Sequence, residues 1–229
     1  MGRIWTRRRP TGTPVSPPAP ALYGRTSTSY RTAMVAPAYF AQPTTTRERL
    51  IAAAFRVVAR DGLEAASVKV IAAEADITPG LLHYHFPGKA ALLEAVLREA
   101  LANYLEASAR RREASPPERQ LADYFKTSRA SLEAERDFFK VRLAFAAAAL
   151  TNPSLAEVLR DLNDASARET ALTLAAARGE TDPTPRDVEI GRLLKAAIDG
   201  IMLSWLADPA FPIDAAADDI EKAVRAWIA

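Results

Sequence analysis

The sequence has no cysteine in its 229 residues, which excludes disulfides, thiolate metal sites and cysteine nucleophiles. It has only nine glycines, and its abundant Ala, Leu, Arg and Glu favour helices over sheets. The longest apolar run, residues 143–150, is much shorter than the about 20 residues that span a bilayer. We therefore expect a soluble, all-α protein located in the cytoplasm.

Histidine is also scarce, and the residues of common catalytic motifs are missing. His83 and His85 are the only two histidines, and their spacing places them on different faces of a helix, which argues against a shared metal ion. The sequence contains no H-E-x-x-H, G-x-G-x-x-G, phosphate-binding P-loop or G-x-S-x-G motif. We predict no enzyme activity, no metal site and no cofactor.

Negative charge is absent from the N-terminal segment, residues 1–43. This segment has six arginines, seven of the sixteen prolines and no acid or lysine. Subtracting those six charges from the net charge of +2 leaves −4 for residues 44–229, so nucleic-acid binding by the folded part requires a local patch. The composition is typical of a disordered basic, proline-rich extension.

Three interpretations of this extension remain open. Arginines without acids favour contact with phosphates, as in an arm that follows DNA. A transit or twin-arginine signal is disfavoured, because no apolar segment follows Arg7, Arg8 and Arg9. The extension can also be dispensable, with Met34 as the true start.

The sequence pattern of residues 44–91 predicts three short helices. Thr45 and Glu48 form a capping-box pattern, and Asp61-Gly62 ends the first helix after an apolar stripe of helical period. Ser67 is a suitable N-cap for the second helix, and Thr78 caps the third, with Pro79 at its first position. Two short helices joined by a tight turn at Asp76 predict a helix-turn-helix.

Residues 92–229 predict a second, helical domain, which brings the total to about nine helices. A long helix over about residues 88–112 is followed by segments 117–134, 137–150, 153–178, 185–207 and 215–228. Their boundaries are indicated by capping residues before prolines or acids and by a closing glycine: Ser115, Asn152, Gly179, Thr184 and Asp214.

The last two predicted helices carry apolar stripes that can pack inside the chain or pair with a second copy, and we favour a homodimer interface. The expected interface residues are Ile190, Leu194, Ile198, Ile201, Trp205, Ile220, Val224 and Trp227. A symmetric dimer is also what a helix-turn-helix needs in order to contact two half-sites.

Two other helix faces in this domain suit a mostly apolar pocket for a small molecule. Their residues are Phe138, Phe139, Arg142 and Phe145 on one helix, and Asp199, Met202 and Trp205 on another. Each of them also fits an ordinary core position. Asp199 is the most specific candidate, because a carboxylate in an apolar stripe needs a partner such as Arg142, Arg192 or a cationic ligand.

The segments TTTRERLIAAAFRVVARDG and SVKVIAAEADITPGLLHYHFPGKAALLEAVL resemble the N-terminal DNA-binding domain of the TetR family of transcriptional regulators. The resemblance covers about residues 44–93 and includes the aromatic and histidine cluster and the lysine that opens the fourth helix. It implies a homodimer that binds double-stranded operator DNA, and a repressor that a small-molecule effector releases. The alternative is a helical interaction or scaffold protein without sequence-specific DNA binding.

Carried over by position, the resemblance implies a recognition helix over residues 78–85. Thr78, Pro79, Gly80 and Leu81 would face base edges, and His83, Tyr84 and His85 would contact bases and phosphates. Lys89, Ser67 and Arg47 would contact phosphates.

The segment departs from the family pattern at the turn, where Asp76 replaces the usual Gly, and on the recognition helix, where Pro79 and Leu81 replace polar residues. We therefore expect contact between Leu81 and a thymine methyl group, or recognition of DNA shape, to supplement hydrogen bonds.

Overall fold

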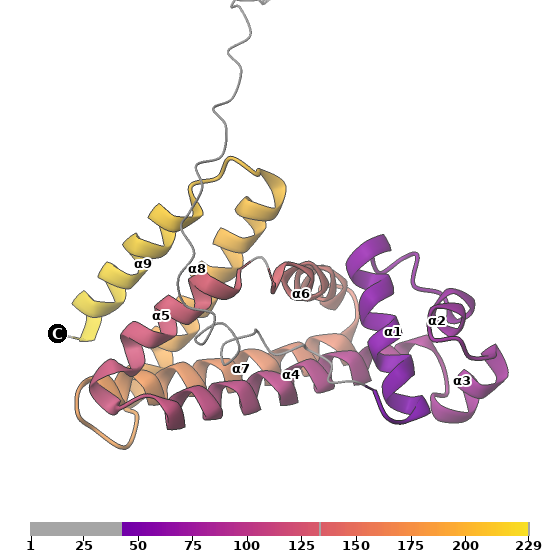
Figure 1. Ribbon diagram of the computed structural model, residues 1–229, viewed down its shortest axis with the longest axis horizontal. Coiled ribbons are helices and arrows are strands. Elements are labelled where there is room, and N and C mark those ends of the chain that lie inside the picture. Colours follow the sequence, from indigo (N-terminus) through magenta and orange to yellow (C-terminus); the bar gives the residue numbers. More distant parts are fainter. Residues whose placement is uncertain (1–42, 133, 229) are drawn as a thin grey trace, which may run out of the picture. The chain divides into compact units, whose positions relative to one another are not determined.

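A computed structural model describes residues 43–132 and 134–228 of the chain. These residues form nine α-helices, one short 3₁₀ helix and no strand (Figure 1). The all-α prediction is therefore confirmed. The predicted N-terminal extension, except for Pro43, lies outside the described residues.

The N-terminal part consists of α1 (Thr46–Asp61), α2 (Val68–Glu74) and α3 (Pro79–His85). The capping box of α1 is present, with Thr45 and Glu48 each bonded to the other's backbone N–H. Gly62 ends this helix at a φ of 83°, in the left-handed region that glycine adopts without strain. Ser67 and Thr78 cap α2 and α3 as predicted.

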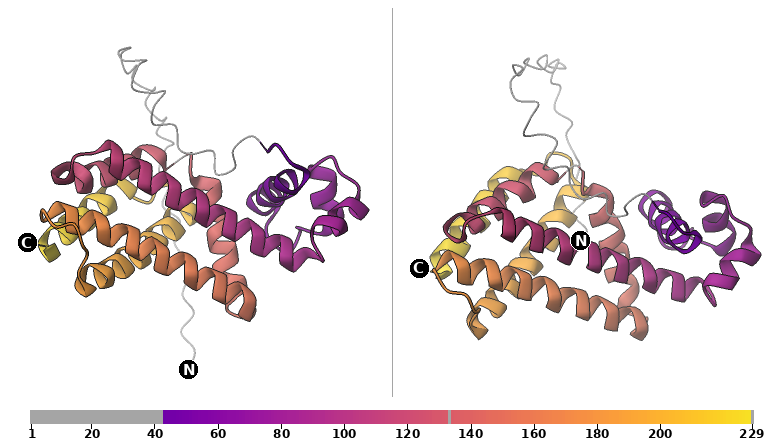
Figure 2. Two further views of the ribbon diagram at one scale, coloured as in Figure 1. Left: turned by 90° about the horizontal axis from the view of Figure 1, so that it is seen from below. Right: turned by 60° about the horizontal axis from the view of Figure 1, so that its bottom comes forward.

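Six helices follow: α4 (Lys89–Ala114), α5 (Gln120–Ser131), α6 (Arg136–Ala149), α7 (Pro153–Ala177), α8 (Pro185–Ala207) and α9 (Ile213–Ile228). Helix α7 packs against α4, α6 and α8, and the long helices α4 and α7 lie side by side (Figures 1 and 2). The expected boundary at residue 91 falls inside α4, so one continuous helix joins the two predicted domains.

One apolar core holds α1, α2 and α3 against α4, α6 and the start of α7. Its fully buried members include Leu50 of α1, Ile71 of α2, Leu82 of α3, Leu92 of α4 and Phe145 of α6. A second cluster joins α5, α7, α8 and α9. Because Leu82 is the one buried residue within α3, the rest of this short helix is left to face outward.

Two predicted helix starts are wrong. Ser115 does not cap a helix over residues 117–134: it is the C-cap of α4, and its hydroxyl donates to Asp123. The next helix follows Pro116 and has no side-chain cap. The chain forms a 3₁₀ helix, η1 (Pro117–Arg119), before α5 begins. Helix α9 begins at Ile213, which places Asp214 inside the first turn and not at the cap.

Candidate DNA-binding surface and effector region

Helix α3 is a short helix held by one inward anchor, Leu82, and by its N-cap. The Leu81 N–H donates to the Thr78 hydroxyl over 3.4 Å. In the turn before it, Asp76 has a φ of 55°, the one positive φ of a non-glycine residue in the described part of the chain. Asp tolerates this left-handed conformation better than most residues, so the turn forms without the glycine usual in the family.

The outward face of α3 consists of the residues that the sequence predicted to contact DNA. Tyr84 is 82% exposed and Leu81 is 42% exposed. Thr78, Pro79, Gly80 and His83 are also exposed, and His85 is half-buried, with its ring edge-on to Tyr84 at 5.1 Å between centroids. An exposed face with a phenol, an imidazole and an isobutyl group can offer both hydrogen bonds and methyl contacts to base edges.

The start of α2 exposes Lys69 and Val70, two residues that were not among the predicted DNA contacts. Ser67 is exposed and accepts a hydrogen bond from the Val70 N–H over 3.3 Å. Lys69 and Val70 are exposed on the same helix, while Ile71 and Ala72 are buried. In the sequence, the apolar residues Val68, Ile71, Ala72 and Ala75 recur at helical spacing. This pattern places Lys69 on the opposite, outward face and could have identified it as an exposed cation.

Two predicted phosphate ligands have contacts within the chain. The Lys89 ammonium donates to the Leu63 carbonyl over 2.8 Å, and the Arg47 guanidinium lies over the Phe86 ring at 5.2 Å from its centroid. A third cation, Arg49, donates to the Ala75 carbonyl over 2.7 Å. These contacts orient the cations around the helix-turn-helix and satisfy carbonyls at its turns.

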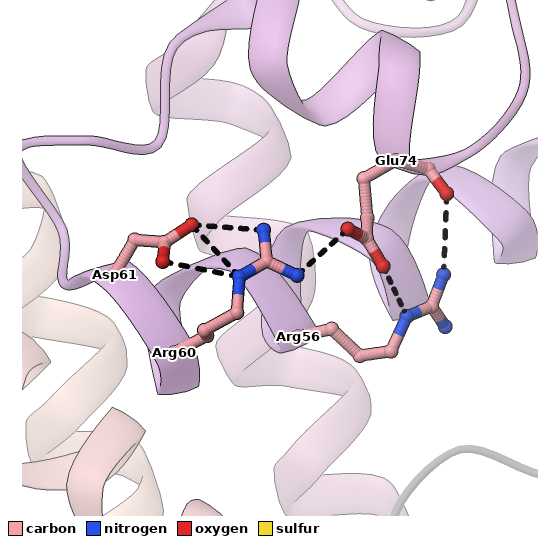
Figure 3. Close-up of polar contacts among 4 residues, drawn as sticks. All are labelled: Arg56, Arg60, Asp61 and Glu74. Atoms are coloured by element: carbon pink, nitrogen blue, oxygen red, sulfur yellow. Dashed lines mark hydrogen bonds and ion pairs between the residues drawn. The ribbon is translucent and has the colours of Figure 1, made fainter.

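A network of four side chains joins α1 to α2 (Figure 3). Glu74 of α2 pairs with Arg56 at 2.8 Å and with Arg60 at 2.9 Å, and Arg60 also pairs with Asp61. The hydrogen bonds from Arg56 and Arg60 hold the pKa of the Glu74 carboxyl below its ordinary value. The network links α1 to α2, the first helix of the helix-turn-helix.

The predicted pocket residues lie on α6 and α8, and these helices do pack against each other. Arg142 and Asp199 form the expected ion pair at 2.9 Å, whereas Arg192 pairs with Asp164. Phe145 and Met202 are buried in the core, Trp205 lies under the Arg136 guanidinium, and Phe138 and Phe139 are half-buried. The charged groups of this predicted site thus satisfy each other.

A small recess, too narrow to admit a water molecule, lies between α4, α5 and α7. Its lining residues are Tyr104, Ser108, Arg111, Arg112, Tyr124, Glu169, Thr170 and Thr173. The Arg111 guanidinium covers the Tyr124 ring at 5.2 Å from the centroid, and Arg112 forms an ion pair with Glu169. Burial raises the pKa of the Tyr124 phenol, so this hydroxyl remains a neutral hydrogen-bonding group.

The predicted dimer residues divide into two groups. Ile190, Leu194 and Val224 are fully buried within the chain, and Trp205 nearly so, so these four have no surface left for a second copy. Ile198, Ile201 and Ile220 are half-buried, and Trp227 is 42% exposed. Helix α8 has a second stripe of apolar and small residues, which was not part of the predicted interface. Its members are all exposed: Leu193, Ala196, Gly200, Leu203 and Ala207.

The described part of the chain, residues 43–132 and 134–228, has neither a candidate metal site nor a candidate membrane-spanning helix. No group of three or more His, Cys, Asp or Glu side chains in these residues is arranged to hold a metal ion. No helix in these residues has the length and apolar character required to cross a membrane.

Comparison with known proteins identifies both parts of the chain. The family described as "Bacterial regulatory proteins, tetR family" matches residues 50–96, and the family described as "BetI-type transcriptional repressor, C-terminal" matches residues 117–229. The second match covers the helices whose sequence gave only a general helical pattern.

Three similar proteins agree with these matches. The nicotine-responsive repressor HdnoR of Paenarthrobacter nicotinovorans is 29% identical over 72% of this chain and 86% of its own length. The regulator BetI of Burkholderia mallei is 30% identical over 69% of this chain and 80% of its own. The crystal structure of a transcriptional regulator from Rhodococcus sp. Rha1 is 30% identical, with a TM-score of 0.67, over 80% of this chain and 96% of that one.

Proposed function

Because the chain belongs to the TetR family of transcriptional regulators, we propose that it is a homodimeric cytoplasmic repressor that an organic cation releases from its operator. The regulator class and its partner, operator DNA, follow from the family, whose members are not enzymes. The exposed face of α3 with Tyr84 at its centre supports the assignment of the reading residues. A scaffold protein without DNA binding has no need of an exposed phenol and an exposed imidazole, Tyr84 and His83, side by side on one short helix.

Operator binding is tested by gel shift with DNA from upstream of the protein's own gene. We expect salt-dependent, sequence-specific binding by the full chain and by a chain without residues 1–33. Tyr84→Ala and Lys89→Ala should weaken it, each by about tenfold or more. The matched control is Leu150→Ala, which truncates a residue 87% exposed at the end of α6. Binding that disappears only when residues 1–33 are removed would assign the DNA contact to that segment.

Dimerisation is proposed through the exposed stripe of α8, together with Trp227 of α9. The residues Leu193, Ala196, Gly200, Leu203 and Ala207 are spaced by three and four positions in turn, which is the spacing of a seam between two packed helices. Leu193 and Leu203 are 53% and 56% exposed, and the small residues between them allow close approach.

Sedimentation tests the proposed dimer at micromolar concentration. Leu203→Glu places a charge in the seam and should give a monomer, which also loses high-affinity operator binding because two half-sites are no longer contacted together. Leu150→Glu, an equal change at another exposed leucine, should stay dimeric. A dimeric Leu203→Glu variant would exclude this seam.

The recess between α4, α5 and α7 is the proposed effector site. Aromatic faces and a carboxylate are the groups that recognise organic cations in proteins. Here the protein's own Arg111 covers the Tyr124 ring, and Arg112 pairs with the Glu169 carboxylate. The recess is closed while these guanidinium groups are in place, so a ligand amine has to displace them from the ring and from the acid. The similarity to a nicotine-responsive repressor supports this class, since nicotine carries a basic amine.

Nicotine and tetramethylammonium serve as probes, with benzoate as the anionic comparison. Binding of either cation should raise the melting temperature and weaken operator binding, and Glu169→Gln should abolish both effects. Glu157→Gln makes the same change at an exposed position of the same helix and should keep both. A response to benzoate alone, or a full cation response in Glu169→Gln, would contradict the proposed site.

A further inference from the structure

Arg142 is the one buried arginine among the described residues, only 5% exposed, and it lies in the middle of α6. Its guanidinium makes three hydrogen bonds to neighbouring helices. Nε and Nη2 donate to the two Asp199 carboxylate oxygens of α8, each over 2.9 Å, and Nη2 also donates to the Asn163 Oδ1 of α7 over 2.8 Å. Lys195 of α8 joins the same carboxylate. One side chain therefore ties α6 to both α7 and α8.

The neighbouring positions on α6 belong to the core of the DNA-binding helices. Val141 and Phe145 are buried in the same cluster as Leu50, Ile51 and Ala54 of α1, and α6 contacts α1 directly. Thus α6 is held by apolar contacts to α1 and by a charged contact to α8. A second cation repeats the link to α8, since Arg136 lies 4.6 Å from the centroid of the Trp205 ring.

A bidentate Arg–carboxylate pair requires a defined geometry, so a shift of α8 that displaces Asp199 acts directly on Arg142 of α6. The close-packed apolar contacts of Val141 and Phe145 then pass a movement of α6 on to α1. A guanidinium that loses this carboxylate keeps only the neutral Asn163 oxygen as its acceptor, and its buried charge is no longer compensated, which favours a movement of α6. Asp199 is 31% exposed, which leaves this partner within reach of solvent and of ligands.

We propose that Arg142 is a positioning residue that transmits the state of α8 to the helix-turn-helix through α6. While the pair with Asp199 is formed, Val141 and Phe145 hold α1 in the position seen here. When α8 shifts, the pair opens and the packing of α6 on α1 loosens. The consequence for operator release rests on the proposed function, but the mechanical link between α8 and α1 does not.

Hydrogen exchange of the α1 backbone amides, residues 50–58, tests the link without DNA. Arg142→Met and Asp199→Asn should each speed exchange in α1 by about tenfold. The matched control is Arg178→Met, which breaks another pair of α8, Arg178–Asp187, away from α6. It should lower the melting temperature but leave exchange in α1 as in the wild type.

Operator affinity and effector binding are then measured on the same variants. Arg142→Met should still show the melting-temperature rise with nicotine but no longer the change in operator affinity. Wild-type α1 exchange in both Arg142→Met and Asp199→Asn would refute the link, and so would equal acceleration in Arg178→Met. A wild-type protein that binds no operator would refute the proposed function, while α1 exchange would still decide the link.

Discussion

In α1 and α2 the paired charges lie at the surface, whereas α6, α7 and α8 also contain two ion pairs with a buried member, Arg142–Asp199 and Arg178–Asp187. Arg56 and Arg60 are more than half exposed where they meet Glu74. Asp187 of α8 is only 1% exposed where it meets Arg178, and Arg142 is almost as buried. Ion pairs between arginines and acids therefore link α1 to α2 at the surface, and link α6, α7 and α8 to one another in partly buried positions.

The difference follows from where each part must be accessible. The helix-turn-helix presents its side chains to a polyanion, so its interior can be apolar and its charges remain solvated. The C-terminal helices bury four hydroxyls, one arginine and one acid: Ser108, Ser166, Thr170, Thr173, Arg142 and Asp187. Buried charges require partners, which makes this part more sensitive to the loss of a single group and better suited to respond to a ligand.

The largest expected effect of a substitution in this comparison is at Asp187. Its carboxylate accepts hydrogen bonds from Arg178 and from the Thr184 hydroxyl and N–H. Asp187→Ala should cost about 2–4 kcal/mol of unfolding free energy, because it removes the charged hydrogen bonds from Arg178 and the capping bonds with Thr184. The surface counterpart, Glu74→Ala, should cost about 1 kcal/mol or less. Urea denaturation measures both, and equal losses would remove the contrast.

The same residue predicts an acid dependence. Burial by itself raises the pKa of Asp187, but the bonds from Arg178 and Thr184 outweigh it and hold the pKa below the ordinary value. Its contribution to stability is therefore full above the unfolded-state pKa of about 3.9 and is lost as pH falls through the lower folded value. Stability measured from pH 5 to pH 2 should fall less steeply in Asp187→Ala than in the wild type.

A smaller effect is expected from adding one methyl group at two glycines. A Cβ at Gly191 of α8 would lie 2.5 Å from the Ala167 carbonyl oxygen of α7, so Gly191→Ala must push the two helices apart and should cost about 1–3 kcal/mol. A Cβ at Gly80 of α3 meets nothing within 4 Å. Gly80→Ala should thus be neutral or stabilising by about 0.5–1 kcal/mol. The melting temperatures of Gly191→Ala and Gly80→Ala, measured beside that of the wild type, test both expectations.

Leu81 offers a test of how α3 reads DNA. If its side chain contacts a thymine methyl, Leu81→Ala should weaken operator binding by about 1 kcal/mol without changing the melting temperature. Replacement of the contacted thymine by deoxyuridine should weaken wild-type binding by a similar amount and leave the variant unaffected. Additive losses from the two changes would show that the methyl group and Leu81 do not meet.

The smallest effect is expected at Asp76, whose carboxylate lies in the turn beside the recognition helix. Asp76→Asn keeps a residue that tolerates the φ of 55° and removes one negative charge. Operator affinity should rise by about twofold to threefold at low salt, and the gain should shrink at high salt because surface charges are screened. A gain that is independent of salt would point to a change in the turn itself.

Most of the N-terminal part was predictable because its signals are local. Thr45, Ser67 and Thr78 cap helices through hydrogen bonds with residues three positions ahead. Such short-range interactions can be recognised from the sequence because both partners lie close together in it. The outward direction of Tyr84 follows once Leu82 is recognised as the anchor. The contact of Lys89 with the Leu63 carbonyl was not predictable, since it joins residues 26 positions apart.

The C-terminal part shows what tertiary structure alone decides. Two stripes of α8 satisfy the helical period, and the one predicted to meet a second copy, with Ile190 and Leu194, faces the chain's own core. Periodicity identifies a helix and its apolar faces, whereas the neighbouring helices determine which face is buried. By itself, the sequence determined the all-α class and the helix-turn-helix, and it showed that the Asp199 carboxylate requires a charged partner. Only packing selected Arg142 as its partner and left Leu193 and Leu203 exposed, because these outcomes depend on contacts between residues far apart in the chain.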